Sequence, residues 1–329
     1  MKKIKKIIPL IVLLTFLFAF TSDLFSWGFY SHKKVNRQAV FCLPPQMVGF
    51  YKQHIEYIIE HSVDPDKRTF ADPKEAPRHY IDIDHYGKDA FTIMPHRWKD
   101  AVAKFTEDTL NEYGINPWWI NTMYYRLVLA FKAKDVDLIL YTSANLGHYI
   151  ADACVPLHNT QFYDGRVLRE KGIHSFWETG VPTLLAEDYD FFTGRAAYIA
   201  DPAEQAWELT EQSQNEIDSV LSAYSWMLDN YPSDKIYSFV SVGAATKKAF
   251  SKEFAIAYSQ RLNNMIERKM RLSLFMVASY WYTAWVDAGQ PDLKIIESKA
   301  VSDSLKKKDA ETEYLWKHGH AKGRANPDD

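Results

Sequence analysis

The sequence predicts an all-α protein built as a single multi-helix domain. Apolar residues recur with helical periodicity through most of the chain, whereas strand-like alternation is weak and Val/Ile/Thr-rich runs between turn residues are scarce. No internal repeat and no Gly/Ser-rich linker divides the chain, although it exceeds the usual length of a domain. We therefore expect one large helical domain over residues 27–290.

Residues 1–26 have the layout of a secretory signal peptide. Four lysines within Met1–Lys6 precede an almost wholly apolar run, Ile7–Phe20, which is shorter than the ~20 residues that a membrane-spanning helix needs. The small residue Ser26 suits cleavage before Trp27. We therefore expect an exported protein, periplasmic or extracellular, with no transmembrane span in the mature chain; an uncleaved anchor is the alternative.

The expected helices follow from stretches of 3.6-residue apolar periodicity, separated by prolines that follow turn-forming residues. Pro156 should end the helix before it, because proline cannot continue the helical hydrogen bonding. After Pro291 the composition becomes charged, and residues 291–329 are expected to form a flexible tail. The expected helices are Met47–His61, Trp98–Tyr113, Trp118–Lys132, Val136–Ala153, Ala203–Asn230, Tyr237–Tyr258 and Arg261–Ala288.

Charge and cysteine content limit the possible functions. Removing residues 1–26 takes away four of the 39 basic and one of the 42 acidic residues, which leaves a formal charge of −6. A broad basic surface for nucleic acid is therefore not expected, and neither is a stable nucleic-acid complex. Cys42 and Cys154 could form a disulfide or remain buried thiols, and the sequence favours neither.

Five residues of metal-ligand type lie within one short segment. His148 with Asp152, and His174 with Glu178, are four residues apart, so each pair can share one helix face, and His158 lies between them. Each pair alone fits an ordinary surface or hydrogen-bonded group equally well. Their neighbours are apolar, however, and buried charged groups must be paired or bind a metal. The segment thus predicts a site for more than one metal ion.

Further ligands are available nearer the N-terminus. Cleavage before Trp27 would create a free α-amino group, whose reference pKa is about 7.7–8 and which can bind a metal once deprotonated, together with its carbonyl. His32 follows five residues later, and Asp64 and His79 stand fifteen residues apart. The spacing leaves Asp64 with competitors, because a loop rich in Asp and Pro is often a solvated turn. The competitors are Asp66, Asp72, Asp82, Asp84 and His85.

In their order, these motifs resemble the zinc-dependent phospholipase C and single-strand-specific nuclease superfamily. The resemblance rests on Trp27-Gly28 with His32, Asp64 followed by His79, the run Gly147–His158 and the run Gly172–Glu178. It covers about half of the mature chain, and the second half matches only as further helices.

The resemblance implies three zinc ions in a cleft of an all-α fold and hydrolysis of a phosphodiester by a metal-bound hydroxide. Asp152 would bridge two ions, and Asp64 would bind metal and orient or deprotonate the attacking water. The implied ligands are Asp64, His79, His148 and Asp152 for the first ion, His158, His174 and Glu178 for the second, and Trp27, His32 and Asp152 for the third.

The substrate is less defined than the reaction. Glutamate as the last ligand, at Glu178, and the sixteen-residue step from His158 to His174 resemble the phospholipase branch. The short step from Trp27 to His32 instead resembles the nuclease branch. The negative charge favours a phospholipid head group, with short single-stranded nucleic acid as the alternative. An alternative of another class is a secreted binding or structural protein that zinc only stabilises.

Overall fold

The computed structural model describes residues 28–242 and 245–319, and the predicted signal peptide and Trp27 lie outside these residues. The all-α prediction is confirmed: helices make up most of the described chain, and its strands are confined to one two-stranded sheet. Within the described residues, no helix is both long and apolar enough to cross a bilayer.

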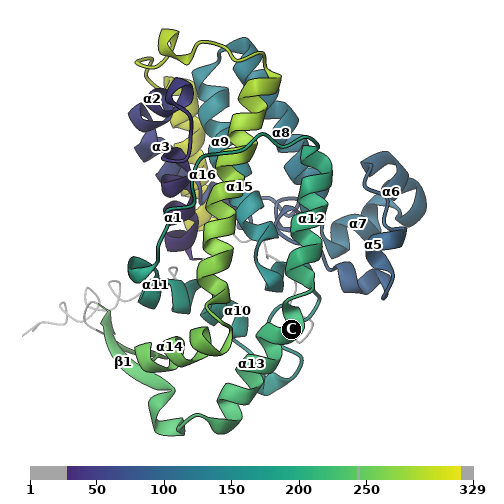
Figure 1. Cartoon of the computed structure of the whole chain (residues 1–329), viewed down its shortest axis with the longest axis vertical. Helices are drawn as coiled ribbons and strands as arrows, with labels where there is room; N and C mark the ends of the chain where they lie inside the picture. The colour runs from purple at the N-terminus through teal and green to yellow at the C-terminus, as the bar shows by residue number, and fades with distance from the viewer. Residues whose placement is uncertain (1–27, 243–244, 320–329) are drawn as a thin grey trace, which may run out of the picture.

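The centre of the molecule is a group of long helices (Figure 1). Helices α8 (Asn116–Ala133) and α9 (Val136–Ala153) pack against each other and against α15 (Met265–Asp287). Helix α1 (Phe29–Val40) lies against α9 and α15, and α12 (Pro202–Gln214) lies against α8. Apolar side chains from all five helices contribute to one core cluster.

Helix α9 was predicted with both of its ends, and the structure confirms them. The side chain of Asp135 caps its first turn by accepting a hydrogen bond from the amide of Leu138, and Pro156 follows soon after its last residue. Gly147 allows α1 to approach closely, because a Cβ atom there would lie 2.0 Å from Asn36 Oδ1. This close approach brings α1 beside the part of α9 that carries His148.

The remaining helices surround this centre. Helices α5, α6 and α7 form a separate lobe with its own small apolar cluster, and α13 and α14 lie with the sheet at the opposite end of the molecule from α2 (Figure 1). Their bounds are α2 Pro45–Gln53, α3 Ile55–His61, α4 Asp64–Arg68, α5 Ala90–Ile93, α6 Trp98–Phe105, α7 Glu107–Tyr113, α10 Ile173–Ser175, α11 Val181–Leu185, α13 Ile217–Asn230, α14 Lys252–Arg261 and α16 Asp303–His318.

Several expected helices are shorter in the structure. The stretch Met47–His61 is divided at His54, and Trp98–Tyr113 is divided at Thr106, whose φ of 70° is incompatible with a continuous helix. The stretch Ala203–Asn230 is divided between α12 and α13. Helical periodicity continues across each break, so the sequence pattern did not reveal them.

The expected helix Tyr237–Tyr258 is wrong over most of its length. Residues Tyr237–Val242 form strand β1 and residues Ala245–Phe250 form strand β2, which pair antiparallel with Tyr237 opposite Phe250. Aromatic and β-branched residues are frequent in this stretch, and such residues favour strands. Helix α14 begins only after β2.

Part of the expected flexible tail is helical in the structure. Asp303–His318 forms helix α16, which packs against α4. Leu305 is its only buried residue, so a hydrophobic pattern could not identify it. The cysteines Cys42 and Cys154 are both buried and not joined by a disulfide.

Candidate metal centre

The last turns of α9 carry the first two candidate ligands. His148 and Asp152 are four residues apart and 0 % and 1 % exposed, and His148 Nε2 lies 3.2 Å from Asp152 Oδ2. Their position on one helix face is the one that the spacing predicts. The two groups therefore point into the same buried volume.

His79 joins this pair from the end of the short 3₁₀ helix η1 (Ala76–Arg78). Its Nδ1 atom lies 3.0 Å from His148 Nε2 and 3.1 Å from Asp152 Oδ2. Zinc bonds of 2.0–2.1 Å in a tetrahedral site place ligand atoms about 3.3 Å apart. The two nitrogens and one oxygen thus have the mutual spacing of ligands around one ion.

The structure brings Asp66, and not Asp64, to this cluster. Asp66 Oδ1 lies 3.4 Å from His148 Nε2 and 3.7 Å from His79 Nδ1. Asp64 Oδ2 instead lies 2.7 Å from His61 Nδ1. Both aspartates are on α4, where residues two apart point in nearly opposite directions, so only one can face the histidines. The structure thus places Asp66 beside the histidines and Asp64, the residue expected from the sequence, beside His61.

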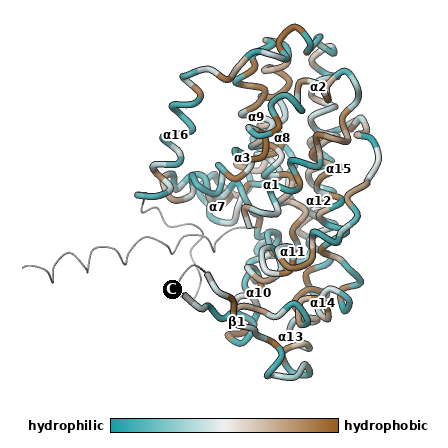
Figure 2. Tube along the Cα trace, turned by 90° about the vertical axis from the view of Figure 1, so that its left-hand side faces the viewer, coloured by the Kyte–Doolittle hydropathy of each residue, from teal (hydrophilic) through white to brown (hydrophobic). Residues whose placement is uncertain are grey.

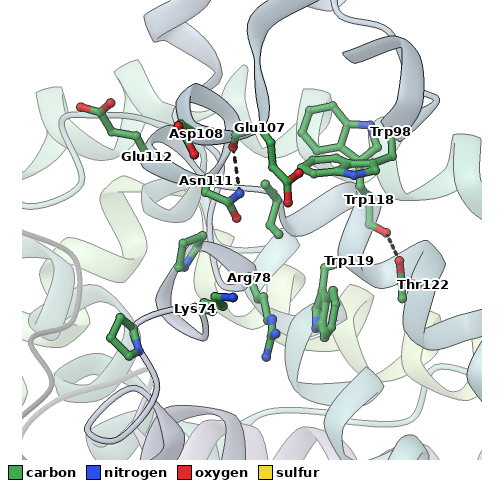
Figure 3. Close-up of a pocket in the computed structure, with 13 residues that line it drawn as sticks. Lys74, Arg78, Trp98, Glu107, Asp108, Asn111, Glu112, Trp118, Trp119 and Thr122 are labelled. Carbon is green, nitrogen blue, oxygen red and sulfur yellow. Dashed lines mark hydrogen bonds between the residues drawn. The ribbon is translucent and has the colours of Figure 1, made fainter. Parts of the chain in front are cut away.

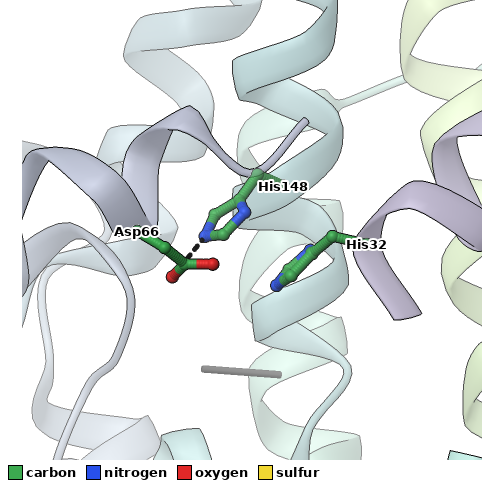
Figure 4. Close-up of side chains that lie close together, drawn as sticks. All are labelled: His32, Asp66 and His148. Carbon is green, nitrogen blue, oxygen red and sulfur yellow. Dashed lines mark ion pairs between the residues drawn. The ribbon is translucent and has the colours of Figure 1, made fainter. Parts of the chain in front are cut away.

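His32, on α1, lies on the side of His148 away from Asp66 (Figure 4). The two imidazole rings stack with centroids 3.8 Å apart, and His32 Nε2 lies 3.4 Å from Asp152 Oδ1. Asp152 therefore directs one carboxylate oxygen toward His79 and His148 and the other toward His32. This arrangement suits a carboxylate that bridges two cations.

The second predicted group also comes together. His158 lies on the 3₁₀ helix η3 (Pro156–Asn159) just after α9, as the break at Pro156 predicts. His174 belongs to α10, and Glu178 to the adjoining π-helical turn η5 (Phe176–Gly180). The Nε2 atoms of His158 and His174 each lie 3.2 Å from Glu178 Oε2.

Backbone carbonyls orient two of the histidines. His148 Nδ1 lies 2.8 Å from the carbonyl oxygen of Ser62, and His158 Nδ1 lies 2.9 Å from that of His79. A carbonyl only accepts, so each Nδ1 carries a proton and donates it, and in a neutral ring the lone pair of Nε2 faces the neighbouring carboxylates. Lone pairs directed at anions require a proton or a metal ion between them.

The donor set fits zinc. It consists of imidazole nitrogens and carboxylate oxygens, both ordinary zinc ligands. In addition, Asp66 Oδ2 is buried without a hydrogen-bond partner in the described part of the chain. A buried carboxylate oxygen in that state is costly unless a cation or water satisfies it.

The protonation of the cluster without a cation follows from its charges. Burial acts to lower the pKa of His148, but the carboxylates of Asp152 and Asp66 have a larger opposite effect and raise the pKa to about 10. Burial lowers the pKa of His158 as well, while Asp152 and Glu178 raise it to about 8. Burial raises the pKa of Asp152, but His148 and His158 together hold it well below its usual range. Metal binding must therefore displace protons.

We expect the metal-free protein to lose stability as the pH rises from 6.5 to 10. A pKa raised by folding adds stability that is complete below the unfolded value of 6.5 and is lost as the pH passes the folded values, about 8 for His158 and about 10 for His148. Zinc should abolish this loss, because the ion replaces the protons.

Urea unfolding followed by circular dichroism at several pH values in this range, with and without zinc, measures the effect. The variant His158→Gln should lack the part of the loss near pH 8. An unfolding free energy of the metal-free protein that stays level or rises over this range would contradict the assignment.

A buried ionic network lies beside His79, on the side of its ring away from the cluster. The sequence did not predict this network. Glu75 is fully buried and accepts hydrogen bonds from Arg68, Arg78 and the hydroxyl of Tyr149. Burial acts to raise the pKa of Glu75, but Arg68 and the other nearby positive groups have a larger opposite effect and lower the pKa to about 2. Glu75 Oε1 lies 3.8 Å from His79 Nε2, on the side of the ring away from the cluster. This charge favours an imidazole whose Nε2 carries the proton and whose Nδ1 is available to a metal.

A cavity of about 700 Å³ lies on the far side of this network (Figure 3). Arg78 lines it and lies 4.0 Å from the ring centroid of Trp119. Trp98 and Trp118 form another wall. Among the candidate metal ligands within residues 28–242, none lines this cavity, so it is distinct from the histidine cluster.

The sequence of the chain matches one known protein family. The sequence profile of the family described as zinc dependent phospholipase C matches residues 31–233, which include every described candidate ligand. The chain belongs to the zinc-dependent phospholipase C family. Comparison with individual curated proteins gives no significant match. Membership in the zinc-dependent phospholipase C family confirms the predicted superfamily and the all-α fold, and makes the protein a zinc hydrolase of that superfamily.

Proposed function

We propose that the protein is an exported phosphodiesterase of the phospholipase C type that depends on three zinc ions. The observation that carries this proposal is the spacing of His79, His148 and Asp152, whose facing atoms lie 3.0–3.2 Å apart in a buried site. A purely structural zinc site is closed by four protein ligands, whereas the group His158, His174 and Glu178 offers three and so leaves a position for water or substrate, as a catalytic site does.

The ligand assignment differs from the family pattern as read from the sequence only at Asp66. Asp152 is common to two ions because its two oxygens face different histidines. Trp27 lies outside the described residues, so its amino group and carbonyl are retained from the sequence. The proposed ligands are Asp66, His79, His148 and Asp152 for the first ion, His158, His174 and Glu178 for the second, and Trp27, His32 and Asp152 for the third.

Zinc bound at these positions would supply Lewis acidity and lower the pKa of coordinated water. A carboxylate of the chain would orient the attacking water. Asp66 Oδ2 has no hydrogen-bond partner in the described chain and can accept one from an attacking water. Burial acts to raise the pKa of Asp66, but the larger opposing effect of His148 and the other histidines lowers it, so this carboxylate remains ionised and can orient an attacking water. We thus transfer to Asp66 the catalytic role first expected for Asp64.

Substrate would approach from the side of His174. The side chain of His174 is 25 % exposed, whereas those of His32 and His148 are 0 % exposed. A phosphodiester that reaches His174 would meet the second group of ligands first. The formal charge of −6 after removal of residues 1–26 favours a phospholipid over long nucleic acid, which is held mainly by basic side chains.

Three substrates test this function directly: phosphatidylcholine vesicles, bis-(p-nitrophenyl) phosphate and single-stranded DNA. We expect the zinc-loaded protein to hydrolyse the first two, to lose activity with a chelator and to regain it with added zinc. Hydrolysis of DNA but not of lipid would favour the nuclease alternative. Zinc binding without hydrolysis of any substrate would favour a zinc-stabilised binding protein.

The proposed third ion depends on a free amino group at Trp27. A form of the protein with one extra residue before Trp27 should bind one zinc ion fewer, because the α-amino group is then an amide without a free electron pair. Its activity should fall in parallel. Metal analysis of the two forms, purified side by side, measures the difference, and equal zinc content with equal turnover would remove Trp27 from the site.

A further inference from the structure

Helix α16 runs along the outside of α9 toward the metal cluster. Just before α16, the amide of Ser302 donates to Asp137 Oδ1 at 3.0 Å, near the start of α9. Two turns further, Lys308 Nζ lies 3.7 Å from the ring centroid of Tyr141. The two helices therefore run in the same direction, and the end of α16 approaches the level of His148.

The middle of α16 is joined to α3 and α4 through His61. Asp309 Oδ2 lies 3.6 Å from His61 Nε2, while His61 Nδ1 lies 2.7 Å from Asp64 Oδ2. The two carboxylates face opposite nitrogens of one ring. His61 thus links α4 to α16, by a hydrogen bond to Asp64 and a longer charged contact with Asp309.

The last turn of α16 contacts both segments that bring distant ligands to the cluster. Glu313 Oε2 lies 3.0 Å from Lys67 Nζ on α4, and Lys67 Nζ lies 3.1 Å from Asp64 Oδ1. The ring of Trp316 lies 5.4 Å from that of Phe29, the first residue of α1. These contacts hold α4 and the first turn of α1 from the outside.

Helix α4 consequently has two functional faces. Asp66 faces the histidine cluster. Lys67 contacts Glu313 of α16, and Asp64 contacts Lys67 and His61, the two residues that join α4 to α16. A helix of five residues is far too short to be stable alone. Its position, and with it the position of the Asp66 carboxylate, must be fixed by what packs against it.

We propose that α16 is a strap that positions Asp66 and His32 for zinc binding by holding α4 and the start of α1. This inference rests on the proposed zinc sites. Residues 303–318 lie outside the part of the chain that the family profile matches, as does the core helix α15. His158, His174 and Glu178 are on η3, α10 and η5, which take no part in the contacts of α16 described above, and their zinc site should not depend on it.

The strap is held mainly by polar contacts. Leu305 is its only buried residue, and α16 is coloured largely hydrophilic in Figure 2. Ion pairs that are partly exposed weaken as salt screens them. We therefore expect zinc binding at the first and third sites to weaken with ionic strength more than binding at the second site.

Two matched double variants of the full chain test the strap. The test variant, Glu313→Gln with Trp316→Ala, removes the contacts to α4 and α1. The control, Glu311→Gln with Tyr314→Ala, makes the same kinds of change at exposed positions of the same helix. Zinc dissociation constants come from competition with a chromophoric chelator, and titrations in Asp66→Asn and His174→Asn backgrounds assign each ion. Hydrogen exchange of the metal-free forms reports on α4.

We expect the test variant to bind zinc about tenfold or more weakly at the site of Asp66, as outer-shell changes do. The zinc dissociation constant of its second site should stay within about twofold of that of the control. Only the amides of α4 and α1 should exchange hydrogen faster than in the control. Equal zinc affinities and equal exchange in the two variants would overturn the strap. So would equal weakening at both sites with faster exchange throughout. If the unsubstituted protein binds no zinc, the proposed function fails, while the exchange comparison still decides whether α16 holds α4.

Discussion

Asp152→Asn should abolish hydrolysis and weaken the binding of two zinc ions at once. The substitution keeps the size of the side chain but removes its charge. Asp152 lies 1 % exposed among four imidazoles, His32, His79, His148 and His158, each with a nitrogen 3.1–3.6 Å from one of its oxygens. Losing a charge shared by two cations should cost about 10³-fold or more in activity.

Asp135→Asn is the matched control, because it makes the same change at the other end of α9. Asparagine caps a helix as well as aspartate does, so the helix should be preserved. Zinc titration and turnover of bis-(p-nitrophenyl) phosphate measure both variants. Full activity of Asp152→Asn with full zinc content would exclude Asp152 as a shared ligand.

Asp66→Asn and Asp64→Asn should differ strongly, although the two residues are neighbours in the sequence. Asp66→Asn removes a charged ligand that faces His148, so zinc affinity should fall about 10–100-fold and activity at least as much. Asp64→Asn changes only the contacts of Asp64 with His61 and Lys67, which in turn contact α16, and asparagine can still accept the hydrogen bond from His61. Its effect on zinc affinity should be about tenfold or less.

The comparison of these two variants is also a test of the helix geometry. The assignment to Asp66 depends on the orientation of α4 and not on sequence spacing. If Asp64→Asn lost more zinc and more activity than Asp66→Asn, the original assignment from the sequence would be restored and the orientation of α4 would be wrong.

The fold could be predicted where a hydrophobic face determines it. Val136–Ala153 is recognisable because its apolar residues pack against three other long helices. Helix α16 could not be recognised, because polar contacts such as that of Glu313 with Lys67 hold it in place. The strands Tyr237–Val242 and Ala245–Phe250 were missed because they are short and resemble a helical pattern when read with the helix that follows.

The candidate site was largely predictable for a related reason. His148 with Asp152, and His174 with Glu178, carry their geometry in a four-residue spacing, and the structure brings both pairs together as expected. The aspartate on α4 was not determined by spacing, because the pattern Asp64-Pro65-Asp66 does not indicate which residue faces inward. Glu75 was missed altogether, since its role arises only when Arg68 and Tyr149 surround it.

Anomalous diffraction at the zinc edge from crystals of the zinc-loaded mature protein tests the central claim most directly. We predict one peak among Asp66, His79, His148 and Asp152, a second among His158, His174 and Glu178, and a third beside His32. The account would be contradicted if neither of the first two positions showed a peak, or if the only peak lay between His61 and Asp309.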